Sequence, residues 1–243
     1  MAAVYAIGDL HGQAGELDRL LALVEADGGP EADLVLLGDL VDRGPDARGV
    51  IDRLVEGRAA GRNWTVLLGN HDRMFLRFLT GGIIHDPAIS SGASWLHPGL
   101  GGRATLASYG VTVPEAVPSG AALQDLRAAA RAAVPAAHLD FLGALDTMRL
   151  DAEHLFVHAG IRPGLPPAVQ AEDDLLWIRE PFLSDRRDHG RLVVHGHTAL
   201  DAARHHGNRL NLDSGAGYGA PATVAAIEGR RAWVLTARGR VAL

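Results

Sequence analysis

The sequence predicts an α/β fold in which central β-sheets are flanked by helices. Through the first third of the chain, short apolar runs alternate with segments whose apolar residues recur at helical spacing. This alternation is typical of parallel strands with helices packed on them. Of the 243 residues, 47% are apolar, which is enough to bury a sizeable core. No linker or internal repeat divides the chain, so we expect residues 1–243 to form a single domain.

Three strand–helix units are expected at the start of the chain. The expected strands are residues 4–7, 34–37 and 64–68, which are short apolar runs of the kind found in buried strands. Each is followed by an amphipathic helix marked by apolar residues on one face: Leu17, Leu20, Leu21 and Val24; Val50, Ile51, Leu54 and Val55; and Met74, Phe75, Phe78 and Leu79.

Residues 81–120 differ from the rest of the chain because they are rich in glycine, serine and proline and show little periodicity. A loop-rich stretch of this length inside a compact domain is usually functional or disordered. It follows the third expected helix, which begins near one of the candidate site residues described below. We therefore interpret residues 81–120 as a mobile cap inserted over the functional edge of the sheet.

The remaining elements follow the cap in a regular order. A helical pair rich in alanine and leucine is expected at residues 121–134 and 136–145, divided by Pro135. Five apolar runs are then expected to form strands: residues 154–157, 192–194, 209–212, 222–227 and 231–235. A short glycine-containing turn joins the last two runs, which predicts a hairpin.

The composition excludes several classes of chemistry. The chain has no cysteine, which rules out disulfides, thiolate nucleophiles, iron–sulfur clusters and cysteine-bound zinc. All 23 basic residues are arginine, so a lysine-containing phosphate-binding loop and Schiff-base chemistry are excluded. The net charge of −6 and the scattered arginines argue against binding to a nucleic-acid duplex. Because a signal-like N-terminus and an apolar run of about 20 residues are both missing, we expect a cytoplasmic protein that binds no membrane.

Five of the expected strands are followed at once by polar residues of the kinds that bind metal ions. These residues are Asp9 and His11, Asp39, Asn70, His158, and the pair His195 and His197. Because parallel strands place their carboxyl ends at one edge of a sheet, we expect these side chains to converge. One such residue alone is more often a helix cap or a packed histidine, but the set supplies enough ligands for two divalent ions. Its mixture of nitrogen and oxygen atoms suits manganese, iron, zinc, nickel or cobalt better than calcium.

The same positions carry five ordered motifs that resemble those of the metallophosphoesterases. The motifs are Gly8-Asp9-Leu10-His11-Gly12, Gly38-Asp39-Leu40-Val41-Asp42-Arg43-Gly44, Gly69-Asn70-His71-Asp72, Val157-His158-Ala159-Gly160 and Val194-His195-Gly196-His197-Thr198. More narrowly, the chain is similar to the bacterial phosphoprotein phosphatase branch, which includes small serine/threonine protein phosphatases and diadenosine tetraphosphatases. That similarity extends to Trp95-Leu96, to residues 105–110 and to residues 175–179, and covers about residues 4–225. The resemblance implies a calcineurin-like fold with the cap as an insertion at residues 81–120.

The resemblance implies a role for each candidate ligand. The implied ligands are Asp9 and His11 for one ion, Asn70, His158 and His197 for the other, and Asp39 as the bridge between them. An Asp–X–His pair on an extended segment presents both side chains on one face, and a carboxylate has two oxygens with which to bridge ions about 4 Å apart. Manganese is the expected ion, with iron, zinc, nickel, cobalt and magnesium as alternatives. Whether His195 is a ligand stays open, because the family accepts other aromatic residues at that position.

Proton transfer and phosphate binding are also implied by the resemblance. His71 is the implied general acid for the leaving group, and Asp42 is the residue that orients its imidazole and raises its pKa. Arg43 and Arg179 are the implied clamps on the phosphoryl oxygens, which a guanidinium fork matches in geometry. A hydroxide bridging the two ions would then attack phosphorus in line, with no covalent intermediate. Asp72 stands where the family usually has glutamate.

Together, these expectations predict an enzyme that hydrolyses phosphate esters. The leading interpretation is a serine/threonine phosphoprotein phosphatase, whose partner is a phosphorylated protein or a small phosphoester. The alternative is hydrolysis of dinucleoside polyphosphates such as diadenosine tetraphosphate, and a third interpretation is a non-catalytic phosphate-binding module. The intact ligand set, together with His71 and both arginines, argues against the third interpretation. The sequence does not distinguish between the first two substrates, and it does not indicate the oligomeric state.

Two roles are open for Trp95 and Tyr109, the large aromatic residues of the cap. Either side chain could stack on an adenine base, or it could pin the cap to the rest of the domain. We favour pinning, because each residue has an apolar neighbour, Leu96 in one case and Val111 in the other.

Overall fold

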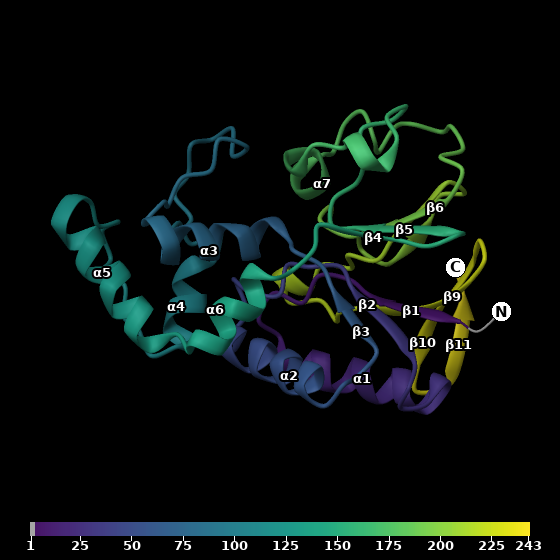
Figure 1. Cartoon of the computed structure of the whole chain (residues 1–243), viewed down its shortest axis with the longest axis horizontal. Coiled ribbons are helices and arrows are strands. Elements are labelled where there is room, and N and C mark those ends of the chain that lie inside the picture. The colour runs from purple at the N-terminus through teal and green to yellow at the C-terminus, as the bar shows by residue number, and fades with distance from the viewer. Residues whose placement is uncertain (1–2) are drawn as a thin grey trace.

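The computed structural model describes residues 3–243 and contains two β-sheets that pack face to face (Figure 1). An apolar cluster between the sheets joins Ala6 and Val35 of the first sheet to Phe156 and Val194 of the second. Helices cover the outer face of the first sheet and gather at one end of the molecule, as Figure 1 shows. The predicted arrangement of central sheets flanked by helices is confirmed.

The first sheet has six strands in the order β11-β10-β9-β1-β2-β3. They are β1 (Val4–Ile7), β2 (Asp33–Leu36), β3 (Trp64–Val66), β9 (Val224–Glu228), β10 (Arg231–Thr236) and β11 (Gly239–Ala242). Strands β1, β2 and β3 run parallel, whereas β9 is antiparallel to β1 and forms the predicted hairpin with β10. Strand β11 is not predicted by the sequence pattern, because all of its residues are exposed and show no apolar alternation.

The second sheet has five strands in the order β4-β5-β6-β8-β7. They are β4 (Met148–Leu150), β5 (His154–Val157), β6 (Leu192–His195), β7 (Arg204–His205) and β8 (Arg209–Asn211). Strands β5, β6 and β8 are parallel and buried, as their apolar runs predict. The sequence pattern misses β4 and β7, which have only three and two residues. The five strands expected to carry ligands therefore belong to two sheets, and the expectation of one edge of one sheet is wrong.

Seven α-helices accompany the sheets in the described part of the chain. They are α1 (Ala14–Gly28), α2 (Ala47–Ala59), α3 (Asn70–Gly81), α4 (Gly102–Ser108), α5 (Gly120–Ala133), α6 (Ala136–Gly143) and α7 (Glu172–Trp177). Helices α1 and α2 bury Leu17, Leu20 and Val50 in the core, on the faces that the sequence predicts. Helix α3 begins at Asn70, so its first turn lies at the candidate site. Within residues 3–243, no helix combines the length and the apolar character needed to cross a membrane.

The segment of residues 81–120 is more ordered than the loop-rich cap that the sequence suggests, because it contains α4 and contributes to the main core. Trp95 is only 1% exposed, and its ring packs against Phe78 of α3 with the ring centres 5.1 Å apart. Tyr109 is buried as well, and its hydroxyl group forms a hydrogen bond with His138 of α6. Both aromatic residues pin the segment to the domain, and neither has a free face for an adenine base.

Candidate metal centre and active site

The segments that follow β1, β2, β3, β5 and β6 carry the predicted site residues, with Asn70 and His71 in the first turn of α3. Apart from glycines, five residues of the described chain have a positive φ angle, a conformation that is strained for an L-amino acid. They are His11, Asp39, Asp42, Arg43 and His197, with φ from 45° to 73°. All five are residues that the sequence predicts to be functional. Because strain of this kind concentrates at functional sites, the backbone supports the site independently of its side chains.

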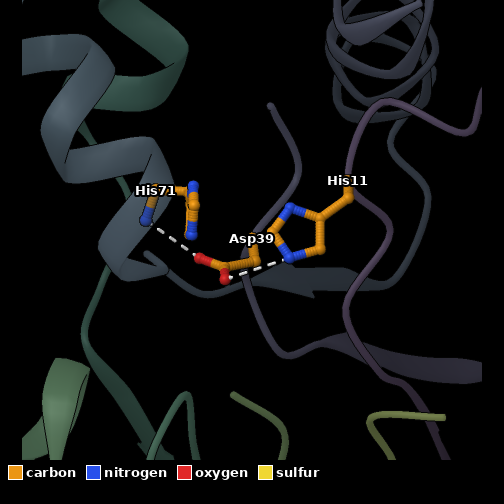
Figure 2. Close-up of side chains that lie close together, drawn as sticks. All are labelled: His11, Asp39 and His71. Atoms are coloured by element: carbon orange, nitrogen blue, oxygen red, sulfur yellow. Dashed lines mark hydrogen bonds and ion pairs between the residues drawn. The ribbon is translucent and has the colours of Figure 1, made fainter. Parts of the chain in front are cut away.

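Asp39 lies between two groups of side chains that could each hold a metal ion. The potential ligand atoms of Asp39, His11 and His71 lie within 4.8 Å of one another, as do those of Asp39, His158 and His197. Asp39 Oδ2 is 3.5 Å from His11 Nε2, and Asp39 Oδ1 is 3.4 Å from His158 Nε2. Figure 2 shows Asp39 between His11 and the backbone nitrogen of His71, which donates to Oδ1 over 3.0 Å. Its membership of both groups is what a bridging carboxylate requires.

Asn70 adds an amide oxygen to the group of His158 and His197. Its Oδ1 is 2.8 Å from His158 Nε2 and 2.9 Å from His197 Nδ1. The other ring nitrogen of His158 donates to the carbonyl oxygen of Leu37 over 2.9 Å, which orients the ring. Burial lowers the pKa of His197 well below its usual value, so this ring is neutral and offers a lone pair. Its Nε2 is buried and has no hydrogen-bond partner among the described residues.

His11 is oriented in a similar way at the other end of the site. Its Nδ1 donates to the carbonyl oxygen of Val41 over 3.0 Å, which leaves Nε2 facing Asp39. Burial lowers the pKa of His11 well below its usual value, so Nε2 carries a lone pair. That lone pair accepts from Arg43 Nη1 over 2.7 Å, which places a positive charge at this end. Neutral imidazoles beside carboxylate and amide oxygens form a donor set that fits divalent transition-metal ions.

Asp9 is buried beside these groups but belongs to neither of them. Both of its carboxylate oxygens lie 3.2 Å from the backbone nitrogen of His197, which donates to them. Burial, followed by the charge of Asp213, raises the pKa of Asp9 well above its usual value. Only glycine fits at position 196, because a side chain on Gly196 would collide with Asp9 Oδ1. The structure thus holds Asp9 through the last motif and not in a group with His11.

His71 and Asp42 form a buried hydrogen-bonded pair. His71 Nδ1 donates to Asp42 Oδ2 over 2.6 Å. Asp42 is fully buried and also accepts from Trp95 Nε1 over 2.8 Å and from Thr105 Oγ1 over 2.6 Å. Burial disfavours the charged imidazole, but Asp39 and Asp42 outweigh this effect and raise the pKa of His71 above its usual value. Bonds from two residues of the segment 81–120, which is distant in the sequence, therefore fix Asp42 and, through it, the ring of His71.

Arg43 and Arg179 line one cavity of about 220 Å³ at this site. The other lining residues are Asp39, Asn70, His71, Ala88, Ile89, Ser90, Leu100, Trp177, His197, Asp213 and Tyr218. Arg43 Nη2 is 3.2 Å from His71 Nε2, and its guanidinium carbon lies 4.7 Å from the centre of the Tyr218 ring. Two guanidinium groups facing one polar cavity, next to a histidine that can donate a proton, are suited to binding a phosphoryl group.

The structure shows the contacts of His195 and Asp72, two residues whose roles the sequence left open. His195 belongs to neither metal-binding group; its Nε2 accepts from Arg209 Nη1 over 3.2 Å. Burial, followed by the charge of Arg209, lowers the pKa of His195 to about 3. Asp72 accepts from the backbone nitrogens of Leu40 and Gly69, each over 2.9 Å. Its short side chain therefore ties the loop after β2 to the first turn of α3.

Seven residues of the cavity are absent from the predicted site. Four of them lie in the segment 81–120, and the other three are Asp213, Trp177 and Tyr218. Asp213 and Tyr218 follow β8, to which no recognised motif belongs. The sequence nevertheless contains a signal for Asp213. This residue directly follows the apolar run 209–212, just as the other candidate ligands follow apolar runs. Trp177 lies within residues 175–179, where only Arg179 is predicted to be functional.

A family model described as calcineurin-like phosphoesterase matches residues 2–226. Curated relatives match over shorter stretches. The symmetrical bis(5'-nucleosyl)-tetraphosphatase of Janthinobacterium sp. (strain Marseille) is 40% identical over 77 residues, which are 32% of this chain and 27% of that protein. The enzyme of the same name from Paracidovorax citrulli (strain AAC00-1) is 48% identical over 71 residues, 29% of this chain and 24% of that protein. The matched stretch thus spans about a quarter of these relatives.

Two solved structures share the fold over nearly the whole chain. One is described as a "putative diadenosine tetraphosphatase" and has a TM-score of 0.66 at 24% identity, covering 96% of this chain and 92% of that one. The other is a cold-active protein-tyrosine phosphatase of a psychrophile, Shewanella sp., with a TM-score of 0.63 at 18% identity, covering 100% and 80%. At these identities the likeness shows the fold alone.

Proposed function

Because the chain belongs to the calcineurin-like phosphoesterase family and is thus a hydrolase of phosphate esters, we propose that it acts on phosphoserine and phosphothreonine in proteins. The observation that carries this proposal is the pair of His71 and Asp42 beside a cavity that Arg43 and Arg179 also line. A cavity of about 220 Å³ has room for a phosphoryl group, and a phosphorylated side chain on a protein surface can present its phosphate there.

The proposal includes two divalent cations. The residues that would hold them are Asp9, His11, Asp39, Asn70, His158 and His197. The neutral rings of His11 and His197 and the shared position of Asp39 support this assignment. When bound, the cations supply Lewis acidity that makes water nucleophilic near neutral pH, and they offset the charge of the phosphate. We propose manganese because the donor set mixes nitrogen with oxygen.

The chain's own residues bind the phosphate and deliver a proton. Arg43 and Arg179 hold the phosphoryl oxygens and stabilise the charge that spreads over them during the reaction. His71 donates a proton from Nε2 to the leaving oxygen, while Asp42 holds Nδ1 and stabilises the charged ring. Water is the nucleophile, so no side chain forms a covalent intermediate.

A dinucleoside tetraphosphate is the second candidate substrate. The names of the curated relatives favour it, since both are tetraphosphatases. Tyr218 supports it too, because this residue is 72% exposed and lines the cavity beside Arg43. A nucleobase could stack on the exposed face of its ring.

The substrate proposal is tested by assaying three compounds side by side with manganese present: a phosphoserine peptide, p-nitrophenyl phosphate and diadenosine tetraphosphate. We expect the highest kcat/KM for the phosphopeptide. His71→Asn, purified in parallel, controls for contaminating phosphatases. If kcat/KM is about tenfold higher for diadenosine tetraphosphate than for the phosphopeptide, the dinucleotide replaces the phosphoprotein as the proposed substrate. If the manganese-loaded protein hydrolyses none of the three compounds, the proposed function is wrong.

A further inference from the structure

Asp213 is a buried carboxylate at the candidate site, as are Asp9, Asp39, Asp42 and Asp72, although no motif contains it. It follows β8, is 4% exposed, and lines the same cavity as Asp39, His71 and His197. Asp9 and Asp39 are each 2% exposed. The carboxylates of Asp9, Asp39 and Asp213 are therefore collected where water has little access.

Asp213 and Asp9 lack the counter-ions that buried carboxylates usually have. Among residues 3–243, no arginine or histidine side chain lies within ion-pair distance of either carboxylate. By contrast, the buried carboxylate of Asp86 is paired with both Arg73 and Arg77. An unpaired buried carboxylate destabilises the fold unless a cation or hydrogen-bond donors compensate it.

Asp213 also takes part in an Asx turn, which is a structural role that would require no ligand. Asp213 Oδ1 accepts from the backbone nitrogen of Gly215 over 3.0 Å, and its own backbone nitrogen donates to Asn211 Oδ1 over 2.9 Å. These bonds fix the side chain, and no residue of the described chain donates to Oδ2. Asparagine would accept the same bond from Gly215 without burying a charge, so the turn does not explain the carboxylate.

A second unpartnered group lies at the same cavity. His197 is only 9% exposed, and its Nε2 has no hydrogen-bond partner in the described residues. Gly196, the preceding residue, lies between Asp9 and Asp213. A side chain there would collide with Asp9 and come within 3.7 Å of Asp213 Cβ. Unused oxygen and nitrogen atoms on neighbouring residues point to a positively charged ligand among them.

We propose that Asp213 is an additional carboxylate of the metal centre, where it raises the affinity for the divalent cation that Asp9 would hold. Arg43 and Arg179 line the same cavity, but neither guanidinium lies within ion-pair distance of Asp9, Asp39 or Asp213. A second divalent cation offsets the remaining negative charge. The inference rests on the proposed function, because it concerns the same pair of cations.

The test compares Asp213→Asn with the wild-type protein after both have been freed of metal by a chelator. In calorimetric titrations with Mn²⁺, we expect the wild-type protein to bind two ions and the variant to lose about 10- to 100-fold in affinity for one of them. We also expect the metal-free variant to have a higher Tm than the metal-free wild-type protein, because one of several like charges is gone. Asp188→Asn is the matched control, since Asp188 accepts from Gly190 in the same kind of turn over 2.9 Å but is exposed.

The outcomes of this comparison distinguish a failure of the inference from a failure of the proposed function. Equal affinities and equal metal-free Tm values in the Asp213→Asn variant and the wild-type protein would leave Asp213 as a turn residue and overturn the inference alone. Asp213→Ser keeps an acceptor for Gly215 and replaces the first variant if that variant does not fold. Wild-type protein that binds no divalent cation would overturn the proposed function together with the inference.

Discussion

The proposed proton transfer depends on a single imidazole, that of His71, which its neighbours orient and whose charged form they stabilise. The bond of 2.6 Å from His71 Nδ1 to Asp42 turns Nε2 toward Arg43, which lines the cavity. The carboxylates of Asp39 and Asp42 raise the pKa of His71 despite its burial. In the structure Arg43 donates to Nε2, so this contact has to give way before His71 donates a proton from Nε2 to a leaving oxygen.

His71→Asn should lower kcat by about 10²-fold or more while the metal content stays near that of the wild-type protein. Asparagine cannot transfer the proton that the leaving oxygen needs. The loss should be smaller for p-nitrophenyl phosphate, whose leaving group requires little protonation. Steady-state kinetics with both substrates and metal analysis check these statements. A variant that loses metal would show that His71 is a ligand, as its group with His11 and Asp39 also allows.

Asp39→Asn should weaken the binding of both cations, because Asp39 is the residue shared by both groups and the substitution removes its charge. Metal analysis after dialysis should find fewer than one ion per chain, against two in the wild-type protein. Asp27→Asn is a suitable control, since Asp27 pairs with Arg240 outside the site. Loss of only one ion in Asp39→Asn would contradict a bridging role.

The segment between α3 and α5 acts on the site mainly through its packing, although residues 88–90 and Leu100 also line the cavity. Trp95 comes before α4 and Thr105 lies within it, and both donate to the carboxylate of Asp42. The segment therefore supports the pair of His71 and Asp42. A change in the segment should affect all substrates alike, unless it concerns residues 88–90 or Leu100, which line the cavity.

Trp95→Phe should keep the ring in the core and remove one hydrogen bond from the buried carboxylate of Asp42. We expect a loss of about 1–3 kcal/mol in the free energy of unfolding and a similar fractional fall in kcat/KM for all three substrates. Urea denaturation and kinetics measure the two effects. Trp233→Phe is the control, because Trp233 is half-buried and makes only cation–π contacts with arginines. A rise in KM confined to diadenosine tetraphosphate would instead indicate that Trp95 binds the nucleoside.

At the scale of the whole molecule, the site joins the two sheets. Asp39 and Asn70 follow strands of the first sheet, whereas His158 and His197 follow strands of the second. The four side chains meet through contacts of 2.8–3.4 Å. A cation bound among them would connect both sheets, so its binding energy would also stabilise their packing.

Removal of divalent metal by a chelator should abolish hydrolysis, and manganese should restore it. The metal-free protein should also have a lower Tm, because a cation that binds only the folded chain stabilises it by about 2.7 kcal/mol at 100 times its Kd. Differential scanning calorimetry with and without manganese gives the shift. Full turnover by protein that metal analysis finds to be metal-free would refute the two-cation mechanism.

The sequence was informative wherever a short-range pattern controls the structure. Apolar runs identified the buried strands β1, β2, β5 and β6, and periodicity identified helices α1, α2 and α3, because burial of one face imposes these patterns. The exposed strand β11 and the very short strands β4 and β7 carry no such pattern, since packing with neighbouring strands and not local preference creates them. The same limit applies to the cap, whose buried aromatic residues have contact partners far away in the chain.

By itself, the sequence determined which chemical groups this protein has and that they follow the ends of buried strands. Ordered motifs were sufficient for this, because ligand types and strand ends are local properties of the chain. Only the tertiary structure decided that Asp9 lies outside both candidate metal-binding groups, that His195 turns to Arg209, and that Asp213 lies beside Asp9. Only it brought Trp95 to Asp42, which is 53 positions away. Such contacts depend on how two sheets and a long insertion pack in space, and no local pattern in the sequence records that packing.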